Sequence, residues 1–252
     1  MGYRLEVSPI LLALMPSLWS CVEAPAAPAR GVVTAPESPA EASAPSAPSP
    51  AVEAPSPLVT ERLLPFDAER VALTLAYRGE HQGPEHARDV HITPRAVVLH
   101  WTGGPTAESA WQTFAPARLA GRPELQGGGA LNVSAHYLID RDGSITRLLP
   151  DDVMARHAIG LNHAAIGVEN VGGGDRWPLT EAQVAANVQL VRALVAAHPG
   201  ITQLYGHHEV AGLRGDPLYL ELDPNYTNQK PDPGPEFMTA VRAGVAELGL
   251  GP

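Results

Sequence analysis

Apolar positions between residues 58 and 252 form short continuous runs that alternate with longer helical patterns. The runs at 95–100, 166–171 and 201–205 predict buried strands. Two alternating runs, 134–139 and 144–149, flank an Asp-Gly turn, which predicts a β-hairpin. Strands interleaved with helices indicate an α/β domain, in which a mixed β-sheet is flanked by α-helices.

Capping and helical spacing predict where the helices lie. Thr180 with Gln183 three residues later forms a capping box, and Pro199 ends the helix that it opens. We expect one helix from Pro105 or Thr106 through Leu119 and a final one over 235–248. The remaining segments are less regular: 73–77 is a short strand or a turn of helix, and 121–129 and 154–164 are loops.

The N-terminal fifth of the chain has a different composition. Residues 1–20 contain an apolar run too short for a membrane span of roughly 20 residues, which is typical of a secretory signal peptide. That run ends at Leu18-Trp19-Ser20-Cys21, which resembles the lipobox of bacterial lipoproteins. Residues 21–57 are rich in Ala, Pro and Ser and predict a disordered tether, so the folded domain is expected over 58–252.

Charge and cysteine content exclude several classes of site. The chain has 27 acidic and 17 basic residues, a formal charge of -10, and no basic run, which argues against a nucleic-acid partner. Cys21 is the single cysteine, so neither an internal disulfide nor a cysteine-based zinc cluster is possible. Any metal site must therefore consist of histidines and carboxylates.

Such a set is present at the ends of the predicted strands. Three predicted strands end in His100, Glu169 and His207, and Asp232 lies on the proline-rich turn that begins with Lys230. Catalytic zinc usually takes three protein ligands and leaves a fourth position open for water. We therefore expect His100, His207 and Asp232 to bind one zinc ion, Glu169 to handle protons and Lys230 to meet a developing negative oxygen.

Each assignment has a structural alternative. His100 could be a satisfied core histidine, Glu169 a salt-bridge partner and Lys230 a solvated loop residue. His208 is expected to face away from the metal, because neighbouring strand residues point to opposite faces. The other histidines interpreted as surface residues are His81, His86, His91 and His198.

Five motifs in order carry a family resemblance. They are His100-Trp101-Thr102, the segment 134–143, Ile166-Gly167-Val168-Glu169-Asn170, Gly206-His207 and Lys230-Pro231-Asp232-Pro233-Gly234. Together they resemble the zinc-dependent N-acetylmuramoyl-L-alanine amidases of the amidase-2 family, which includes AmpD-like enzymes and peptidoglycan recognition proteins. The resemblance covers about residues 93–248.

The resemblance implies a single catalytic domain that cleaves the amide between N-acetylmuramic acid and L-alanine in peptidoglycan or muropeptides. It matches His100, His207 and Asp232 to the zinc ligands, and Glu169 and Lys230 to the catalytic pair. It places His136, His157 and Asn162 where the family lines its cleft, without assigning their roles. With the lipobox, it implies a lipoprotein anchored through Cys21 at the periplasmic face of a Gram-negative outer membrane; otherwise the protein is secreted.

Two departures distinguish branches of the family. The interval from His207 to Asp232 is longer than in short AmpD-like enzymes because residues 212–228 are inserted, and this insertion is expected to line the cleft. Asp232 and Ala135 stand where the recognition-protein branch has a cysteine and a tyrosine, which favours the AmpD-like branch.

Two other functions remain open. A recognition module would keep the groove without catalysis, although such modules typically lose a zinc ligand. Two histidines and a carboxylate also form the facial triad of non-haem iron oxygenases. Those enzymes commonly place the carboxylate two residues after the first histidine, where this chain has Thr102.

Overall fold

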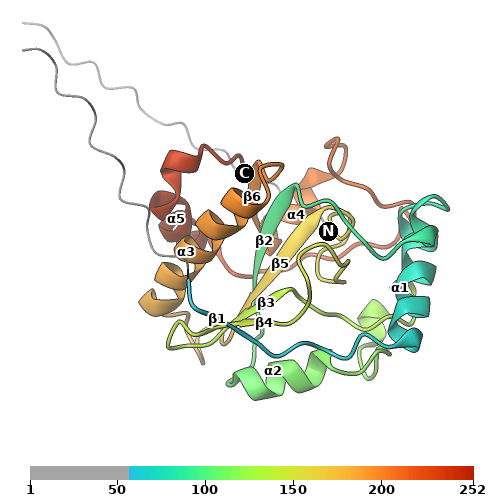
Figure 1. The fold of residues 1–252 in the computed structure, drawn as a ribbon, viewed down its shortest axis with the longest axis horizontal. Helices are drawn as coiled ribbons and strands as arrows, with labels where there is room; N and C mark the ends of the chain where they lie inside the picture. The colour runs from blue at the N-terminus through green and yellow to red at the C-terminus, as the bar shows by residue number, and fades with distance from the viewer. Residues whose placement is uncertain (1–56) are drawn as a thin grey trace, which may run out of the picture. The chain divides into compact units, whose positions relative to one another are not determined.

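A six-stranded mixed sheet forms the centre of the computed structural model, which describes residues 57–252 (Figure 1). The predicted signal peptide, Cys21 and the tether up to residue 56 lie outside the described residues. The strands are β1 (Val59–Glu61), β2 (Ala96–Trp101), β3 (Tyr137–Ile139), β4 (Ile145–Arg147), β5 (Ala165–Asn170) and β6 (Gln203–Gly206). Their order is β1-β4-β3-β5-β2-β6, and only the β3–β4 pair is antiparallel.

Within residues 57–252, five α-helices and four short 3₁₀ helices connect and cover the strands. The α-helices are α1 (Ala68–His81), α2 (Ala107–Phe114), α3 (Glu181–Ala197), α4 (His207–Val210) and α5 (Pro235–Gly244). The 3₁₀ helices are η1 (His86–Arg88), η2 (Pro123–Gly128), η3 (Ala211–Leu213) and η4 (Ala246–Leu248). Among these helices, none combines the length and apolar character needed to cross a membrane, as judged for residues 57–252. The predicted mixed sheet flanked by helices is confirmed.

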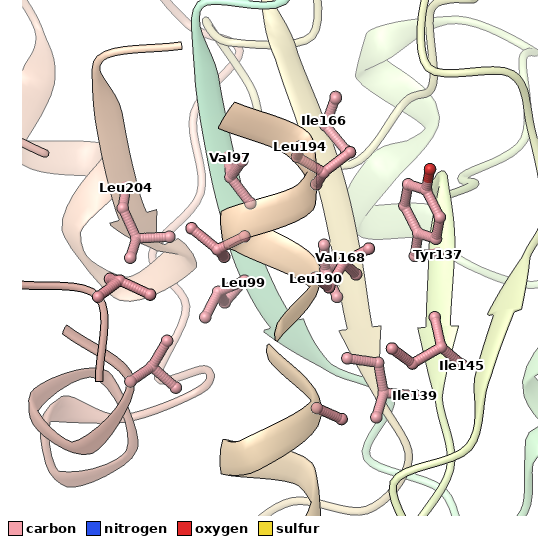
Figure 2. Packing of buried hydrophobic residues seen from close by; sticks show 14 of the residues in the cluster. Val97, Leu99, Tyr137, Ile139, Ile145, Ile166, Val168, Leu190, Leu194 and Leu204 are labelled. Atoms are coloured by element: carbon pink, nitrogen blue, oxygen red, sulfur yellow. The ribbon is translucent and has the colours of Figure 1, made fainter. Parts of the chain in front are cut away.

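One face of the sheet packs against α3 and α5. Side chains that alternate along the strands, such as Val97 and Leu99 on β2 and Ile166 and Val168 on β5, meet Leu190 and other apolar residues of α3 (Figure 2). All of these side chains are buried, and burial of a Val, Leu or Ile side chain contributes about 1.5–3 kcal/mol. The alternate side chains of each strand therefore define this core.

The opposite face carries smaller apolar groups and the candidate site. Ala96 and Val98 of β2 pack there with Leu161 from the loop after β4, and Leu138 of β3 packs with Phe114 of α2. Strand alternation places His100 on this face, two residues beyond Val98. The sheet thus separates a helix-covered apolar face from a face that offers polar side chains.

The predicted capping box and hairpin are both present. Thr180 Oγ1 accepts a hydrogen bond from the Gln183 amide at 3.2 Å, and Gln183 Oε1 accepts one from the Thr180 amide at 3.0 Å. In the hairpin the Gly143 amide donates to the Asp140 carbonyl at 2.9 Å, and Gly143 has φ +88°, a conformation that favours glycine.

Helix α1 was not recognised from the sequence pattern, which left residues 73–77 undecided. Its buried side chains are mostly polar: Arg70, Thr74, Tyr77, Arg78 and His81. Arg70, for example, donates to the carbonyl oxygens of Phe114, Ala115 and Pro116, at and just beyond the end of α2, where carbonyl groups lack partners within the helix. Because polar groups occupy the inward face, no apolar periodicity indicates this helix.

Four expectations about the bounds or content of segments were wrong. Helix α2 ends at Phe114 and does not continue to Leu119. The loop 121–129 contains η2, and the final helix stops at Gly244 before a separate 3₁₀ turn. His207 does not end a strand: β6 stops at Gly206 and His207 is the first residue of α4.

Candidate metal centre and cleft

Register in the centre of the sheet brings the candidate residues together. Strand β2 pairs in parallel with β5, which places His100 directly beside Glu169. It also pairs in parallel with β6, where Leu99 is beside Gly206. His207 follows Gly206 and so lies at the level of His100. Three segments that are distant in sequence therefore converge at the carboxyl ends of three neighbouring strands.

Three buried atoms form a small triangle at this point. His100 Nδ1 lies 2.9 Å from His207 Nδ1 and 3.3 Å from Asp232 Oδ2, and the third side, from His207 Nδ1 to Asp232 Oδ2, is 3.0 Å. Ligand atoms at about 2.0–2.1 Å from a tetrahedral zinc ion are roughly 3.3 Å apart. The donor set and the spacing therefore fit a single divalent ion bound by these three residues.

The protonation states of the triangle suit metal binding. Burial, followed by the proximity of His207, lowers the pKa of His100 to about 4, against an opposing effect of Asp232. Burial by itself would raise the pKa of the Asp232 carboxyl, but hydrogen bonds with His100 and His207 hold it well below its usual value. At neutral pH the site thus presents a neutral imidazole at His100 and an ionised carboxylate, as metal coordination requires.

The turn that carries Asp232 is tied to α4. The His208 amide donates to the Asp232 carbonyl oxygen at 2.8 Å, and the His208 ring Nδ1 lies 3.1 Å from the same oxygen. His208 therefore contacts the main chain of Asp232 and is not part of the triangle. The reason is the geometry of a short helix, since His207 and His208 are not consecutive strand residues as we expected.

Glu169 lies in the same cleft with an unsatisfied carboxylate oxygen. Its Oε2 is buried and has no hydrogen-bond partner among the described residues. Burial raises the pKa of Glu169 to about 8, and the negative charge of Asp232 raises it as well, against smaller opposing effects of Arg122 and Lys230. A carboxyl whose pKa lies near neutrality can take up and release a proton at working pH.

Lys230 is partly exposed and also lines the cleft. Its positive charge lowers the pKa of both His100 and Glu169, so it acts electrostatically on the metal triangle and on the free carboxylate. A lysine in this position can meet negative charge on a bound ligand. The five candidate residues predicted from the sequence thus line one cavity of about 290 Å³.

The inserted segment forms part of the cavity wall, as we expected. Tyr226 and Asn228 line the cavity from this segment, together with residues from the first half of the domain such as Phe114 and Leu125. The contact is close: a Cβ on Gly128 would lie 2.2 Å from Tyr226 Cζ, so the 3₁₀ helix η2 can approach the tyrosine only with glycine at that position.

Arg156 is a site-lining residue that sequence reasoning missed. It is 2% exposed and donates to the carbonyl oxygens of Leu125 and Leu131 and to the hydroxyl of Tyr226. These contacts join the loop 154–164, η2 and the inserted segment. No pattern in the sequence indicates the role, because its acceptors come from separate loops.

The surroundings of the two histidines and one asparagine that had no assigned role now show which of them belong to the cavity. His157 and Asn162 line the cavity, whereas His136 does not. His136 is fully buried, with Nε2 2.9 Å from the Val153 carbonyl oxygen and Nδ1 accepting from the Gly167 amide, so it is a satisfied core histidine. Burial, followed by the proximity of His100 and His136, lowers the pKa of His157 well below its usual value.

The interpretation of His81 as a surface residue was wrong. Its side chain is 1% exposed, and its Nδ1 lies 2.8 Å from Oε1 of Glu221, which is equally buried. His91 is exposed, while His86 and His198 are partly buried. His81 was misread because its partner belongs to the insertion, 140 residues away in sequence.

Comparison with known proteins defines the class to which this site belongs. Residues 91–235 match the Amidase_2 family model, described as N-acetylmuramoyl-L-alanine amidase. The match spans more than half of the 252 residues, so the chain belongs to this family. The resemblance inferred from the motifs is thereby confirmed at the level of the family.

Particular relatives are similar over shorter stretches. The chain is 34% identical over 116 residues to the 1,6-anhydro-N-acetylmuramyl-L-alanine amidase AmpD of Salmonella typhimurium (strain SL1344), which covers 42% of this chain and 54% of that protein. It is 38% identical over 88 residues to the Endolysin of Escherichia phage T7, covering 33% and 58%. The chain thus spans little more than half the length of the curated relatives it matches.

A solved structure, the N-acetylmuramoyl-L-alanine amidase LysC from Clostridium intestinale URNW, superposes with a TM-score of 0.48 and 20% sequence identity. The superposition covers 76% of this chain and 99% of that chain.

Proposed function

We propose that this protein is a zinc-dependent amidase that cleaves the bond between N-acetylmuramic acid and L-alanine in peptidoglycan or in muropeptides. The observation that carries the proposal is the triangle of His100 Nδ1, His207 Nδ1 and Asp232 Oδ2, with sides of 2.9, 3.0 and 3.3 Å. Family membership supports the choice of substrate class.

The donor set supports zinc over harder or softer ions. Two imidazole nitrogens and one carboxylate oxygen make a mixed site typical of catalytic zinc, with three protein ligands and an open position. When bound, zinc supplies a Lewis acid that polarises a carbonyl and lowers the pKa of coordinated water from 15.7 to about 7. The remaining chemistry belongs to the side chains around it.

Glu169 holds and moves the proton. Its buried Oε2 has no partner among the described residues and its pKa is raised to about 8, so the carboxyl can accept a proton and then release it. The departing alanine nitrogen needs a proton because an amine anion is a poor leaving group. General acid–base catalysis of this kind contributes about 10²–10⁴-fold.

Lys230 and the cleft wall handle the substrate. Lys230 faces the cleft as a cation and stabilises the negative charge that develops on the carbonyl oxygen during attack. The cavity of about 290 Å³ has Phe114 and Tyr226 as aromatic lining. These surfaces orient a peptide beside the metal centre. The His208 amide of α4 holds the main chain of Asp232 in place through its carbonyl oxygen.

Digestion of defined muropeptides tests the proposal. Purified protein is incubated with muropeptides that carry reducing or 1,6-anhydro ends, with and without a chelator, and products are measured by mass spectrometry. We expect free stem peptide only when zinc is present. His207→Ala should abolish its release, whereas His163→Ala, which changes a histidine outside the cavity, should retain it.

Other outcomes separate the alternatives. Tight muropeptide binding without release of stem peptide in the zinc-loaded protein would favour a recognition module. Iron in place of zinc in elemental analysis of the purified protein would favour the oxygenase. Comparison of the two muropeptide ends shows which class the cleft accepts.

We further propose that Cys21 carries lipid and anchors the domain at the periplasmic face of an outer membrane. Leu18, Ser20 and Cys21 match the lipobox pattern, and residues 21–57 have the composition of a tether. Labelling with a radioactive fatty acid in a Gram-negative host should mark the full chain. Label retained by Cys21→Ser, or wild-type protein recovered only in the soluble fraction, would overturn the anchor.

A further inference from the structure

His157 lies directly behind the metal triangle and has no part in the chemistry proposed above. Its Nδ1 is 3.0 Å from Nε2 of His100, on the side of that ring opposite the triangle. Its own Nε2 is 3.1 Å from the carbonyl oxygen of Ala165. The two rings meet nearly perpendicular, at 89° with centroids 5.1 Å apart.

The carbonyl oxygen of Ala165 determines which ring nitrogens of His157 and His100 donate and which accept hydrogen bonds. A carbonyl oxygen only accepts, so His157 Nε2 must carry a proton and donate it. A neutral imidazole has one N–H, so His157 Nδ1 is an acceptor, and Nε2 of His100 must be the donor to it. His100 then has no proton on Nδ1, whose lone pair is left for an ion.

We propose that His157 is the positioning residue that holds His100 in the Nε2-protonated tautomer, with Nδ1 directed at the bound metal. The inference rests on the metal centre of the proposed function and adds the residue that orients one of its ligands. Partners of this kind hold the ring of a metal-binding histidine and raise its basicity.

The surroundings of His157 keep its ring in this place. Asn162 Oδ1 accepts hydrogen bonds from the main-chain amides of His157 and Ala158, at 2.8 and 2.7 Å. Asn162 Nδ2 in turn donates to the Tyr77 hydroxyl of α1 at 2.9 Å. A Cβ on Gly167 would lie 2.6 Å from His157 Cγ, so this strand position leaves room for the ring only as glycine.

The two ligand histidines differ in this respect. His207 Nε2 is buried and has no hydrogen-bond partner among the described residues. His100 is therefore the ligand whose orientation is set from behind, and His207 is held by its place at the start of α4. Loss of His157 should act on the metal through His100.

Paired substitutions separate the two hydrogen bonds of His157. His157→Asn keeps an acceptor oxygen near the position of Nδ1, whereas His157→Gln extends its donor toward the Ala165 carbonyl and loses the acceptor. We expect His157→Gln and His157→Ala to weaken zinc binding about 10–100-fold, as measured by competition with a chromophoric chelator, and His157→Asn to retain most of the affinity. The control His163→Asn, in the same loop, should bind zinc as the wild type does.

A measurement on the wild-type protein tests the same inference even if the variants do not fold. Long-range ¹H–¹⁵N spectra of the zinc-loaded wild type should show His100 and His157 protonated at Nε2 and not at Nδ1. Equal zinc affinity in wild type, His157→Gln and His157→Ala would overturn the proposal, as would a proton on Nδ1 of His157.

These outcomes are distinct from failure of the proposed function, because neither measurement uses a substrate. If zinc binding depends on His157 but the protein cleaves no muropeptide, the proposed amidase function is overturned and the inference about His157 holds. A wild-type chain that takes up no zinc would overturn both.

Discussion

The metal corner and the opposite wall of the cleft are built in different ways. The metal corner consists of residues at strand ends and one turn: His100, Glu169, His207, Lys230 and Asp232. The wall consists of η2 and the inserted segment, joined through Tyr226 and Arg156 and backed by α1 through the His81–Glu221 pair. The corner depends on strand register, whereas the wall depends on buried polar contacts between segments distant in sequence.

The difference teaches which changes should alter chemistry and which should alter stability. Glu169 lies at a strand end, and its buried Oε2 has no hydrogen-bond partner among the described residues. Glu221 has no place near the metal triangle but is fully enclosed against His81. Substitutions in the corner should therefore reduce turnover with the fold intact, and those in the wall should lower stability with zinc binding intact.

The largest effect is expected for Glu169→Ala, which removes the proton-handling carboxyl. Turnover of muropeptides should fall about 10²–10⁴-fold while zinc affinity is retained, because Glu169 is not one of the triangle residues. Steady-state kinetics and chelator competition measure the two quantities. Hydrolysis near the wild-type rate would remove Glu169 from its role; Glu181→Ala, on the exposed start of α3, is the control.

The raised pKa of Glu169 predicts a pH-dependent cost to stability in the metal-free protein. Below pH 4.5 the carboxyl is protonated in both folded and unfolded chains and has no effect. Between pH 4.5 and about 8 the unfolded chain ionises first, so the folded state loses stability as pH rises. Above pH 8 the neutral variant Glu169→Gln should be more stable than wild type by up to about 5 kcal/mol.

Urea unfolding of both metal-free proteins at pH 4 and pH 9 measures this difference. A gap between wild type and Glu169→Gln that is the same at both pH values would contradict burial of the ionised carboxylate. A stability difference that is larger at pH 4 than at pH 9 would mean that the folded state lowers the pKa of Glu169, which contradicts the expected rise.

Lys230→Ala should cost about 2.7–4 kcal/mol of transition-state stabilisation, seen in kcat more than in KM. The reason is that the charge it stabilises develops only during attack. An effect confined to KM would instead assign Lys230 to ground-state binding of an anionic group, and the corner would then have one role fewer than proposed.

The smallest of these effects, on the wall, is expected for Glu221→Ala. It leaves His81 buried without its partner, which should lower the free energy of unfolding by about 1–3 kcal/mol. Zinc affinity should not change. The exposed Arg192–Glu247 pair provides the control: Glu247→Ala should change stability less, since surface ion pairs are well solvated. Loss of zinc binding in Glu221→Ala would show that wall and corner are coupled.

The sequence alone identified the strands β2 to β6, although not the short strand β1, together with the capping box of α3, the hairpin and the five candidate residues of the corner. These features are local, or occur where an apolar run stops, so that pattern and order are enough to find them. Because β2 and β5 pair in parallel, the ends of both strands lie at the same edge of the sheet, and His100 lies beside Glu169.

The tertiary structure alone decided the wall and the support behind the metal. Helix α1 has a polar inward face, so Arg70, Tyr77 and His81 carried no apolar signal in the sequence. Their partners, such as Glu221 and Asn162, lie in distant loops, and a hydrogen bond between remote segments leaves no periodicity along the chain. The local spacing of apolar residues predicts which of them are buried, whereas the partners of buried polar groups are defined only when the chain has folded.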